Sequence, residues 1–142
     1  MNYHFKIHKD KDSLWAECIE LKGCVTQSYK NTMEDLRSMM EEALNAYLNE
    51  PGTSKTIFPY PDESCSGKNV ELVKVHSEVA FALIVRQYRL ENNYTQMEMA
   101  KRLNMKNIII YQRLEKKGDP KLSTIARIKN IFPDIPFEKY LF

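Results

Sequence analysis

Carboxylates are the residues of this sequence that most readily suggest catalysis, because a two-metal nuclease needs several of them converging on one sheet. The first expected strand offers none and carries His4 between apolar residues. Asp10 and Asp12 fall in a polar turn, and Glu17 and Glu20 are too isolated to compensate. We therefore expect no hydrolytic site and no enzyme.

Histidines and cysteines do not form a catalytic or metal-binding pattern along the sequence. His4 and His8 would lie about 13 Å apart on one face of a strand, and His76 is remote. Cys65 lies in a loop-like stretch without a histidine nearby in sequence to activate its thiol. The three cysteines have no C-x-x-C spacing, and the four glycines form no phosphate-binding loop. The sequence predicts no metal, no cofactor and no disulfide framework.

Polar and basic side chains near residues 95–117 are better suited to binding nucleic acid. Bases in the major groove are read mainly by Arg, Asn and Gln, while lysines meet phosphates. The base-reading candidates are Asn107, Gln112 and Arg113, and the phosphate candidates are Lys106, Lys116 and Lys117. Ile108, Ile109 and Ile110 interrupt this set. One or two of them could touch thymine methyls, and Ile108 is our candidate for this contact. Alternatively, all three could be core or dimer-contact residues of a domain that binds DNA weakly or not at all.

Helical periodicity supplies the elements that would position these side chains. Val79, Leu83 and Leu90 share one face of a helix with Ser77 as its expected N-cap. Thr95 should cap a second helix.

Within this second helix, Met99, Ala100 and Leu103 would be buried, and Asn104 can adopt the left-handed conformation that ends it. A third helix would run through Tyr111 to Gly118. This order is the layout of a helix-turn-helix, whose second helix enters the major groove.

The first half of the chain predicts strands before a helix. Tyr3, Phe5 and Ile7 alternate with polar residues, as in a strand with one buried face. Further strands are expected over 14–19, 24–27 and 70–75, and a helix capped by Thr32 should end before Pro51. The sequence thus predicts an α+β chain, with a β-β-β-α-β domain over 1–76 and an all-α domain over 77–142.

In the second half, seven residues resemble the repressor-like helix-turn-helix family over roughly 79–131: Gln96, Glu98, Ala100, Leu103, Arg113, Leu114 and Glu115. The resemblance implies that Gln96 touches a phosphate and that Arg89 pairs with Glu115 as a structural brace. About one residue more than usual separates Leu103 from Arg113.

The run L-W-A-E-C-I-E-L-K-G-C-V-T-Q, followed by a helix ending A-L-N-A-Y-L-N-E-P, resembles the HicB antitoxin family over residues 3 to about 60. This resemblance implies a degenerate ribonuclease-H-like sheet, a HicA-like ribonuclease toxin as partner, and repression of the chain's own operon. Antitoxins of this family end in a ribbon-helix-helix or a helix-turn-helix, and residues 79–131 indicate the second form.

Four residues are candidates for contact with the toxin: Trp15, Glu17, Phe58 and Tyr60. Phe58 and Tyr60 each precede a proline in an extended segment, so they could dock on a partner. They could equally cover their own sheet, and a tryptophan such as Trp15 more often belongs to a core.

The distribution of charge agrees with two binding roles. Residues 1–76 hold 9 Lys and Arg against 12 Asp and Glu, and residues 77–142 hold 12 against 7. An acidic domain suits a basic protein partner and a basic domain suits phosphate. We expect a cytoplasmic homodimer or higher homo-oligomer that binds operator DNA and no membrane. The alternatives are a stand-alone helix-turn-helix regulator with an N-terminal sensor or protein-interaction domain, and a ribonuclease-H-type enzyme.

Overall fold

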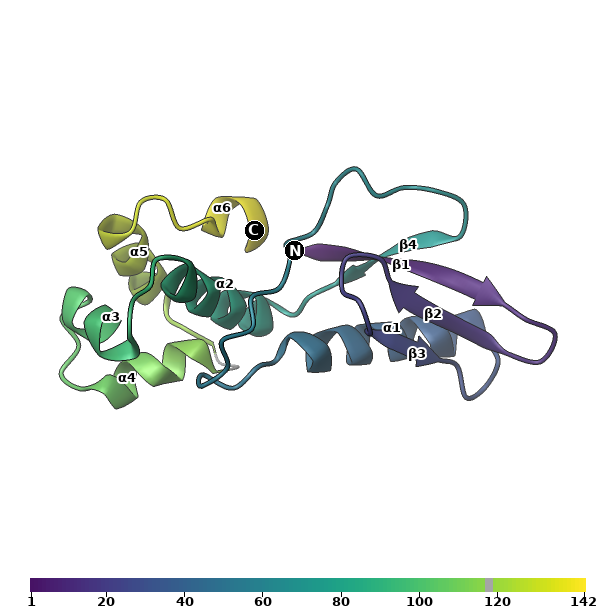
Figure 1. Ribbon diagram of the computed structural model, residues 1–142, viewed down its shortest axis with the longest axis horizontal. Coiled ribbons are helices and arrows are strands. Elements are labelled where there is room, and N and C mark those ends of the chain that lie inside the picture. Colours follow the sequence, from purple (N-terminus) through teal and green to yellow (C-terminus); the bar gives the residue numbers. More distant parts are fainter. Residues whose placement is uncertain (117–118) are drawn as a thin grey trace. The chain divides into compact units, whose positions relative to one another are not determined.

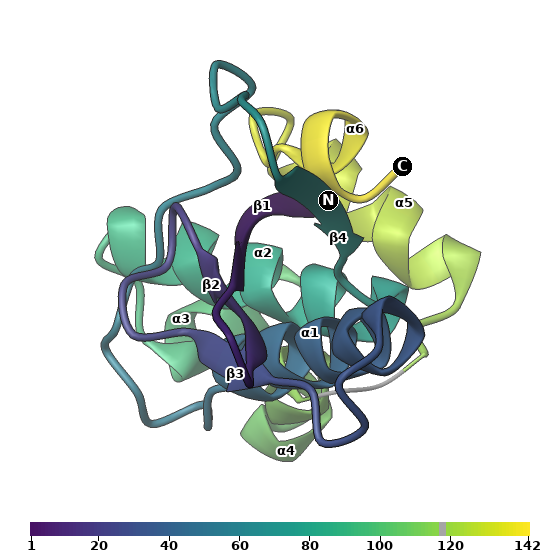
Figure 2. The same cartoon turned by 90° about the vertical axis from the view of Figure 1, so that its right-hand side faces the viewer.

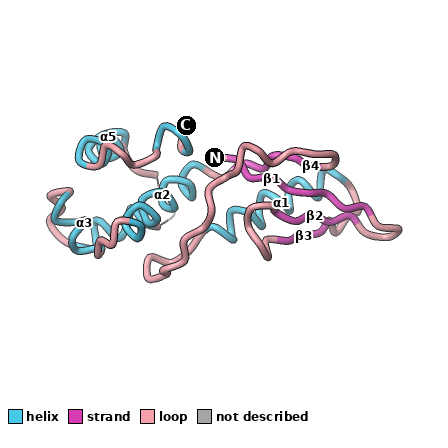
Figure 3. Tube along the Cα trace, turned by 45° about the horizontal axis from the view of Figure 1, so that its top comes forward, coloured by secondary structure: helices cyan, strands magenta, loops and turns pink. Residues whose placement is uncertain are grey.

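A computed structural model of the 142-residue chain describes residues 1–116 and 119–142. It divides into two compact units, and each is described by itself. The first comprises Met1–Leu48 and Phe58–Val75, and the second comprises Asn49–Ile57 and His76–Phe142. The described strands all belong to the first unit, whereas the second is helical (Figure 3). The expected mixed α+β class is thereby confirmed.

The first unit is a four-stranded antiparallel sheet with one helix packed against it (Figure 1). Its elements are β1 (Asn2–Lys9), β2 (Leu14–Cys18), β3 (Val25–Gln27), α1 (Met33–Leu48) and β4 (Val70–Lys74). The spatial order is β3-β2-β1-β4, so β3 and β4 form opposite edges (Figure 2). The predicted order of elements is confirmed, and the second, third and fourth strands are each one residue shorter than predicted.

Strand β4 runs antiparallel to β1, with Tyr3 opposite Val73 and Phe5 opposite Glu71. Helix α1 joins β3 to β4, and a helix that directly connects two strands of one sheet usually leaves them parallel. Here residues 49–69 separate α1 from β4. This additional length allows the chain to turn back before it enters the sheet, which makes the sheet antiparallel throughout.

The core of the first unit lies between the sheet and α1. Its side chains come from alternate positions of β1 and β2 and from one stripe of α1: Tyr3, Phe5, Ile7, Leu14, Ala16, Leu36, Met40, Leu44 and Leu48. Burying one large apolar side chain contributes about 1.5–3 kcal/mol. The alternation of apolar residues along the strands and the apolar stripe of the helix therefore determine that these two faces pack together.

Helix α1 begins in a dense set of hydrogen bonds. Thr32 Oγ1 accepts from the backbone N–H of Asp35 at 3.2 Å, which confirms Thr32 as the cap. Asp35 Oδ2 accepts from the N–H groups of Lys30 (3.2 Å) and Tyr29 (2.8 Å) and from the Ser28 hydroxyl (2.8 Å). These bonds, that from Lys30 first, lower the pKa of Asp35.

The second unit contains α2 (Ser77–Glu91), α3 (Gln96–Arg102), α4 (Ile108–Gln112), α5 (Leu122–Ile131) and α6 (Phe137–Tyr140), with a 3-10 turn, η1 (Arg113–Glu115), directly after α4. Thr95 caps α3 as predicted, since its side chain accepts from the N–H of Glu98 at 3.1 Å. In the described ranges, none of the helices is long and apolar enough to cross a membrane.

Two details of the predicted helices are wrong. Ser77 is the first residue of α2 and not its N-cap; His76 holds that position without a side-chain capping bond. The predicted third helix is divided, because α4 ends at Gln112 and a tighter 3-10 turn follows. Its predicted end at Gly118 lies outside the described residues.

The core of the second unit forms around α2, which is buried from Val79 to Arg89. The ring of Phe81 stacks on that of Phe137 with centroids 5.5 Å apart, and Tyr88 packs against Phe132 at 5.4 Å. Further buried side chains come from the other helices and the segments that join them: Met99, Ala100, Leu103, Tyr111, Ile128 and Ile135.

The segment Asn49–Ile57, which the sequence placed in the first domain, belongs to the second unit. Arg86 is 1 % exposed, and its Nη1 donates to the carbonyls of Ser54 (3.3 Å) and Thr56 (2.8 Å). An extended segment without a strand partner needs donors for its carbonyls. Arg86 of α2 supplies these donors. No periodic pattern in the sequence could show this contact.

Candidate functional site

A buried charged cluster holds α2, α4 and η1 together. Arg89 Nε lies 2.5 Å from Glu115 Oε1, and Arg89 Nη2 donates to Glu115 Oε2 at 3.1 Å. The Tyr111 hydroxyl donates to Glu115 Oε1 at 2.6 Å. Glu115 is 2 % exposed and Arg89 is 7 % exposed. The pair implied by the repressor-like resemblance is thus a two-pronged contact inside the unit.

The electrostatics of this cluster favour the charged pair over its separated members. Burial alone lowers the pKa of Arg89, but the hydrogen bond and charge of Glu115 outweigh it and the net pKa is raised. Burial, followed by the charge of Glu115, raises the pKa of Tyr111. Removing one member would leave an uncompensated buried charge, which typically costs about 3–5 kcal/mol.

Gln96, the expected phosphate contact, also belongs to this network. Its Nε2 donates to Glu115 Oε2 at 2.9 Å, and its Oε1 accepts from Gln112 Nε2 at 3.1 Å. Nε2 also lies 3.5 Å from the Gly52 carbonyl oxygen. The amide's donors and its acceptor are therefore engaged within the unit. Gln96 and Gln112 brace α3 against α4 and η1 in this structure.

Gly52 lies close to the cluster and leaves little room for a side chain. A Cβ at this position would meet Gln96 Nε2 at 2.9 Å and Glu115 Oε2 at 3.4 Å. Arg89 Nη2 donates to the Gly52 carbonyl at 3.3 Å. A side chain at this position would require the Gln96 amide to shift and would disturb its hydrogen bonds, a constraint that the sequence did not reveal.

The turn between α3 and α4 has the local features expected from the sequence. Met99, Ala100 and Leu103 are buried, and Asn104 adopts a left-handed conformation with φ 52°. Asn107, a candidate base reader, is the N-cap of α4, and its Oδ1 accepts from the N–H of Ile110 at 3.1 Å. The side-chain oxygen of Asn107 therefore serves as the cap of the helix.

The basic candidates separate clearly from the polar ones. Lys106, Arg113 and Lys116 are exposed, and none is in a hydrogen bond or ion pair through its side chain in the part of the chain that is described. Lys117 lies outside the described residues. Gln112 is half-buried. The exposed cations surround α4 and η1, where they could meet phosphates.

Two of the three isoleucines of α4 lie outside the unit's core. Ile109 and Ile110 are 57 % and 38 % exposed, and Ile108 is half-buried. The expectation that they could be core residues is wrong for Ile109 and Ile110. What remains is a short apolar surface on α4, with the exposed cations before and after this helix, suited to thymine methyls or to another protein surface.

Trp15 and Glu17, two of the candidate toxin contacts, lie on the face of β2 that points away from α1. Buried Leu14, Ala16 and Cys18 alternate with them. The indole of Trp15 stacks on His8 with centroids 4.1 Å apart, and its Nε1 donates to Asp10 Oδ2 at 3.0 Å. The reading of Trp15 as a core residue is therefore wrong.

Phe58 and Tyr60, the other candidates, differ in exposure. Phe58 is 8 % exposed and packs against the ring of Tyr47 at 5.5 Å, and the neighbouring Pro59 carbonyl accepts from the Tyr3 hydroxyl at 2.8 Å. Tyr60 is half-buried. Of the two roles open for Phe58, the structure favours covering its own unit, because a buried ring offers little surface to a partner.

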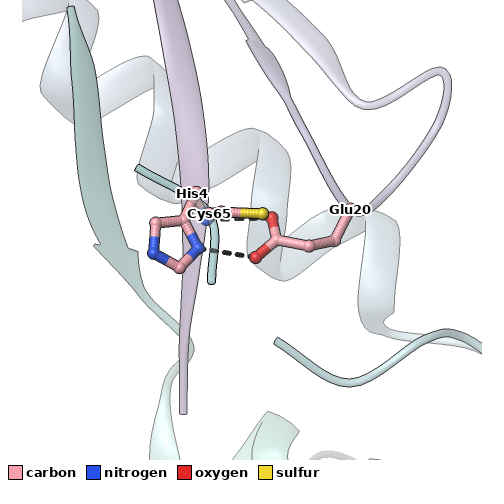
Figure 4. A group of neighbouring side chains, drawn as sticks. All are labelled: His4, Glu20 and Cys65. Carbon is pink, nitrogen blue, oxygen red and sulfur yellow. Dashed lines mark hydrogen bonds and ion pairs between the residues drawn. The ribbon is translucent and has the colours of Figure 1, made fainter. Parts of the chain in front are cut away.

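A further cluster, which the sequence did not indicate, lies where β2 ends beside β1. One ligand atom from each of His4, Glu20 and Cys65 lies within 4.8 Å of the others (Figure 4). Residues 4, 20 and 65 come from distant parts of the chain, so no spacing rule could have grouped them. Cys65 does have a histidine nearby in space, although none is near it in sequence.

A search of family models finds none that matches the chain, and no curated protein matches it significantly.

Proposed function

We propose that this chain is the antitoxin of a type II toxin-antitoxin system. In this proposal the first unit binds a small basic HicA-like ribonuclease and masks its RNA-binding surface. The second unit binds operator DNA as a helix-turn-helix dimer and represses the operon. The proposal rests on the HicB-like order of residues and assigns the first unit a degenerate ribonuclease-H-like fold.

The observation that carries the proposal is that the HicB-like run falls on one continuous structural feature. It covers β2, a turn at Gly23 with φ 92°, and β3, and the matching helix is α1. An L-residue rarely adopts such a φ, so glycine is required at this turn. A sequence pattern that coincides with a hairpin and its packed helix is better explained by common fold than by chance.

The outward face of β2 supports binding to a basic partner. Trp15 presents a half-exposed ring, and Glu17 beside it has a side chain that is 45 % exposed. An aromatic anchor next to a carboxylate is a common composition for a binding hot spot that meets Arg or Lys. We assign toxin contact to Trp15 and Glu17, with Tyr60 as a third candidate.

The exposed cations of the second unit support binding to DNA. Lys106 directly precedes the cap of α4, and Arg113 and Lys116 follow the helix. In this proposal the lysines meet phosphates, Arg113 and Asn107 reach base edges, and Ile108 contacts a thymine methyl. Gln96 and Gln112 keep α3 and α4 in position through the hydrogen bonds of Gln96 to Gln112 and to Glu115.

Coexpression with the product of the neighbouring reading frame tests the antitoxin role. The wild-type chain should copurify with it and rescue growth, whereas Glu17→Lys should weaken both effects by charge reversal. Glu63→Lys is the matched control, because Glu63 is an exposed carboxylate in the same unit but outside the sheet. Failure of the wild type to bind or rescue would contradict the proposal.

An operator-binding titration, with and without the partner, separates the alternative. Specific DNA binding without any toxin partner would identify a stand-alone regulator whose first unit has another role. Metal-dependent RNA cleavage by the purified chain would instead identify an enzyme.

A further inference from the structure

We propose that His4, Glu20 and Cys65 form a binding site for one divalent cation of the zinc class. The cation would fasten the segment between α1 and β4 to the sheet. This site is independent of the toxin and DNA roles proposed above.

The donor atoms are the first argument. The cluster brings together an imidazole nitrogen, a carboxylate oxygen and a thiol sulfur. Zinc accepts all three kinds of ligand, whereas calcium and magnesium are bound almost entirely by oxygen. Three protein ligands would leave the fourth tetrahedral position for water.

The distances are the second argument. Zinc bonds of the usual lengths place tetrahedral ligand atoms roughly 3.3–3.8 Å apart. The ligand atoms of the cluster all lie within 4.8 Å of one another, and His4 Nδ1 is 2.6 Å from Glu20 Oε1 (Figure 4). A cation would replace the direct contact between His4 and Glu20, and rotation of these side chains would provide the small opening required.

The support around the ligands is the third argument. The side chains of His4 and Glu20 are 12 % and 4 % exposed. Glu20 Oε2 accepts from the backbone N–H of His4 at 3.0 Å, and Glu20 Oε1 accepts from that of Asp62 at 3.3 Å. The Cys18 thiol lies 3.6 Å from Glu20 Oε2. Such outer contacts orient a metal ligand before the metal binds.

Cys65 is held in place by its own turn. Its N–H donates to the Asp62 carbonyl at 3.1 Å, and Asp62 Oδ1 accepts from the N–H of Ser64 at 2.9 Å. Because Asp62 also donates to Glu20, this turn is already joined to the other ligands. A cation would deprotonate the thiol on binding and replace weak contacts by coordination.

Titration of the full, reduced, metal-free chain with Co²⁺ tests the site, because cobalt replaces zinc and reports thiolate ligation by an absorption band. We expect one equivalent to bind with a thiolate-to-cobalt band that Zn²⁺ abolishes. Cys65→Ser should remove the band. His4→Gln should reduce affinity by more than the roughly 10- to 100-fold typical of outer-shell partners.

The matched controls are His8→Gln and Cys24→Ala. His8 lies on the same face of β1 as His4, and Cys24 is a second unpaired cysteine of the same unit. Both variants should keep the cobalt band. Absence of a band in the wild type, or a band that survives Cys65→Ser, would overturn the proposal.

Alkylation of the wild-type chain decides the question even if a variant fails to fold. Zn²⁺ should slow the modification of Cys65, located by mass spectrometry, more than that of Cys18 or Cys24. Equal rates for Cys65 with and without Zn²⁺ would show that the cluster is held by hydrogen bonds alone.

Discussion

The side-chain amide of Gln96 donates a 2.9 Å hydrogen bond to the carboxylate of Glu115, a residue that is 2 % exposed. This bond links the start of α3 to the end of η1. A side chain expected to reach outward to a phosphate is thus directed inward to a buried charge.

Gln96→Ala should destabilise the second unit by about 1–3 kcal/mol, because a buried carboxylate loses one of its donors. Urea unfolding followed by circular dichroism measures the change. Met97→Ala is the control, since Met97 is the next residue and is 46 % exposed. Unchanged stability together with weaker DNA binding would instead show that Gln96 serves as a phosphate contact.

Arg89→Ala should lower the stability of the second unit by about 3–5 kcal/mol, because Glu115 would remain buried without its cation. Thermal and urea unfolding should both report the loss. Arg127→Ala, which removes an exposed arginine of α5, should have little effect. The double variant Arg89→Met with Glu115→Leu should lose less stability than Arg89→Ala, because no buried charge is left unpaired, although Tyr111 and Gln96 lose their acceptor. An equal or larger loss would contradict the charge explanation.

Lys106→Ala and Arg113→Ala should both weaken operator binding. If Lys106 meets a phosphate, its loss should also reduce the slope of log affinity against log salt by about one unit. Arg113→Ala should cost about 1–3 kcal/mol if the guanidinium reads a base. Lys11→Ala provides the same charge change in the first unit. Equal operator binding by wild type, Lys106→Ala and Arg113→Ala would contradict the DNA interface.

Phe58→Ala should mainly reduce the stability of the first unit, whereas Trp15→Ala should mainly reduce its binding to a partner. Phe58 is buried, so its truncation should cost about 3–5 kcal/mol of stability. Trp15 lies on the outward face, so its loss should weaken partner binding with a smaller effect on unfolding. Melting temperatures and copurification of each variant separate the two roles. A larger destabilisation by Trp15→Ala would show that the His8 stack is mainly structural.

The Arg37–Glu71 ion pair should make the first unit sensitive to acid. Arg37 Nε and Nη2 donate to Glu71 at 3.0 and 2.9 Å, and this contact lowers the pKa of Glu71 from its ordinary 4.5. Because the folded pKa is lowered, the pair stabilises the fold above pH 4.5, and this contribution is lost as pH falls through the folded value.

Both side chains are partly exposed, so water screens the pair and its effect on the free energy of unfolding should be small. Urea unfolding between neutral pH and pH 3 should show a weaker acid dependence for Glu71→Gln than for Glu63→Gln. Identical pH profiles for these two variants would show that water screens the pair completely.

Local structure was largely predictable from the sequence. Thr32 and Thr95 cap their helices, and Asn104 ends α3 in a left-handed conformation. Each of these features depends on a side chain and a backbone group a few residues apart. The strands and α1 were predictable for a related reason, because burial of one face imposes a period that the residue types display.

Tertiary structure alone decided how distant segments meet. The sequence could not place Asn49–Ile57 with the second unit, direct Phe58 inward and Trp15 outward, or bring Cys65 beside His4 and Glu20. These outcomes depend on the path of the chain between residues many positions apart, which no local preference records. The sequence did identify the polar and basic residues near α4. It could not show that Gln96 and Gln112 face the buried Glu115 network, because that also depends on how distant segments meet. Lys106 and Arg113 face solvent instead.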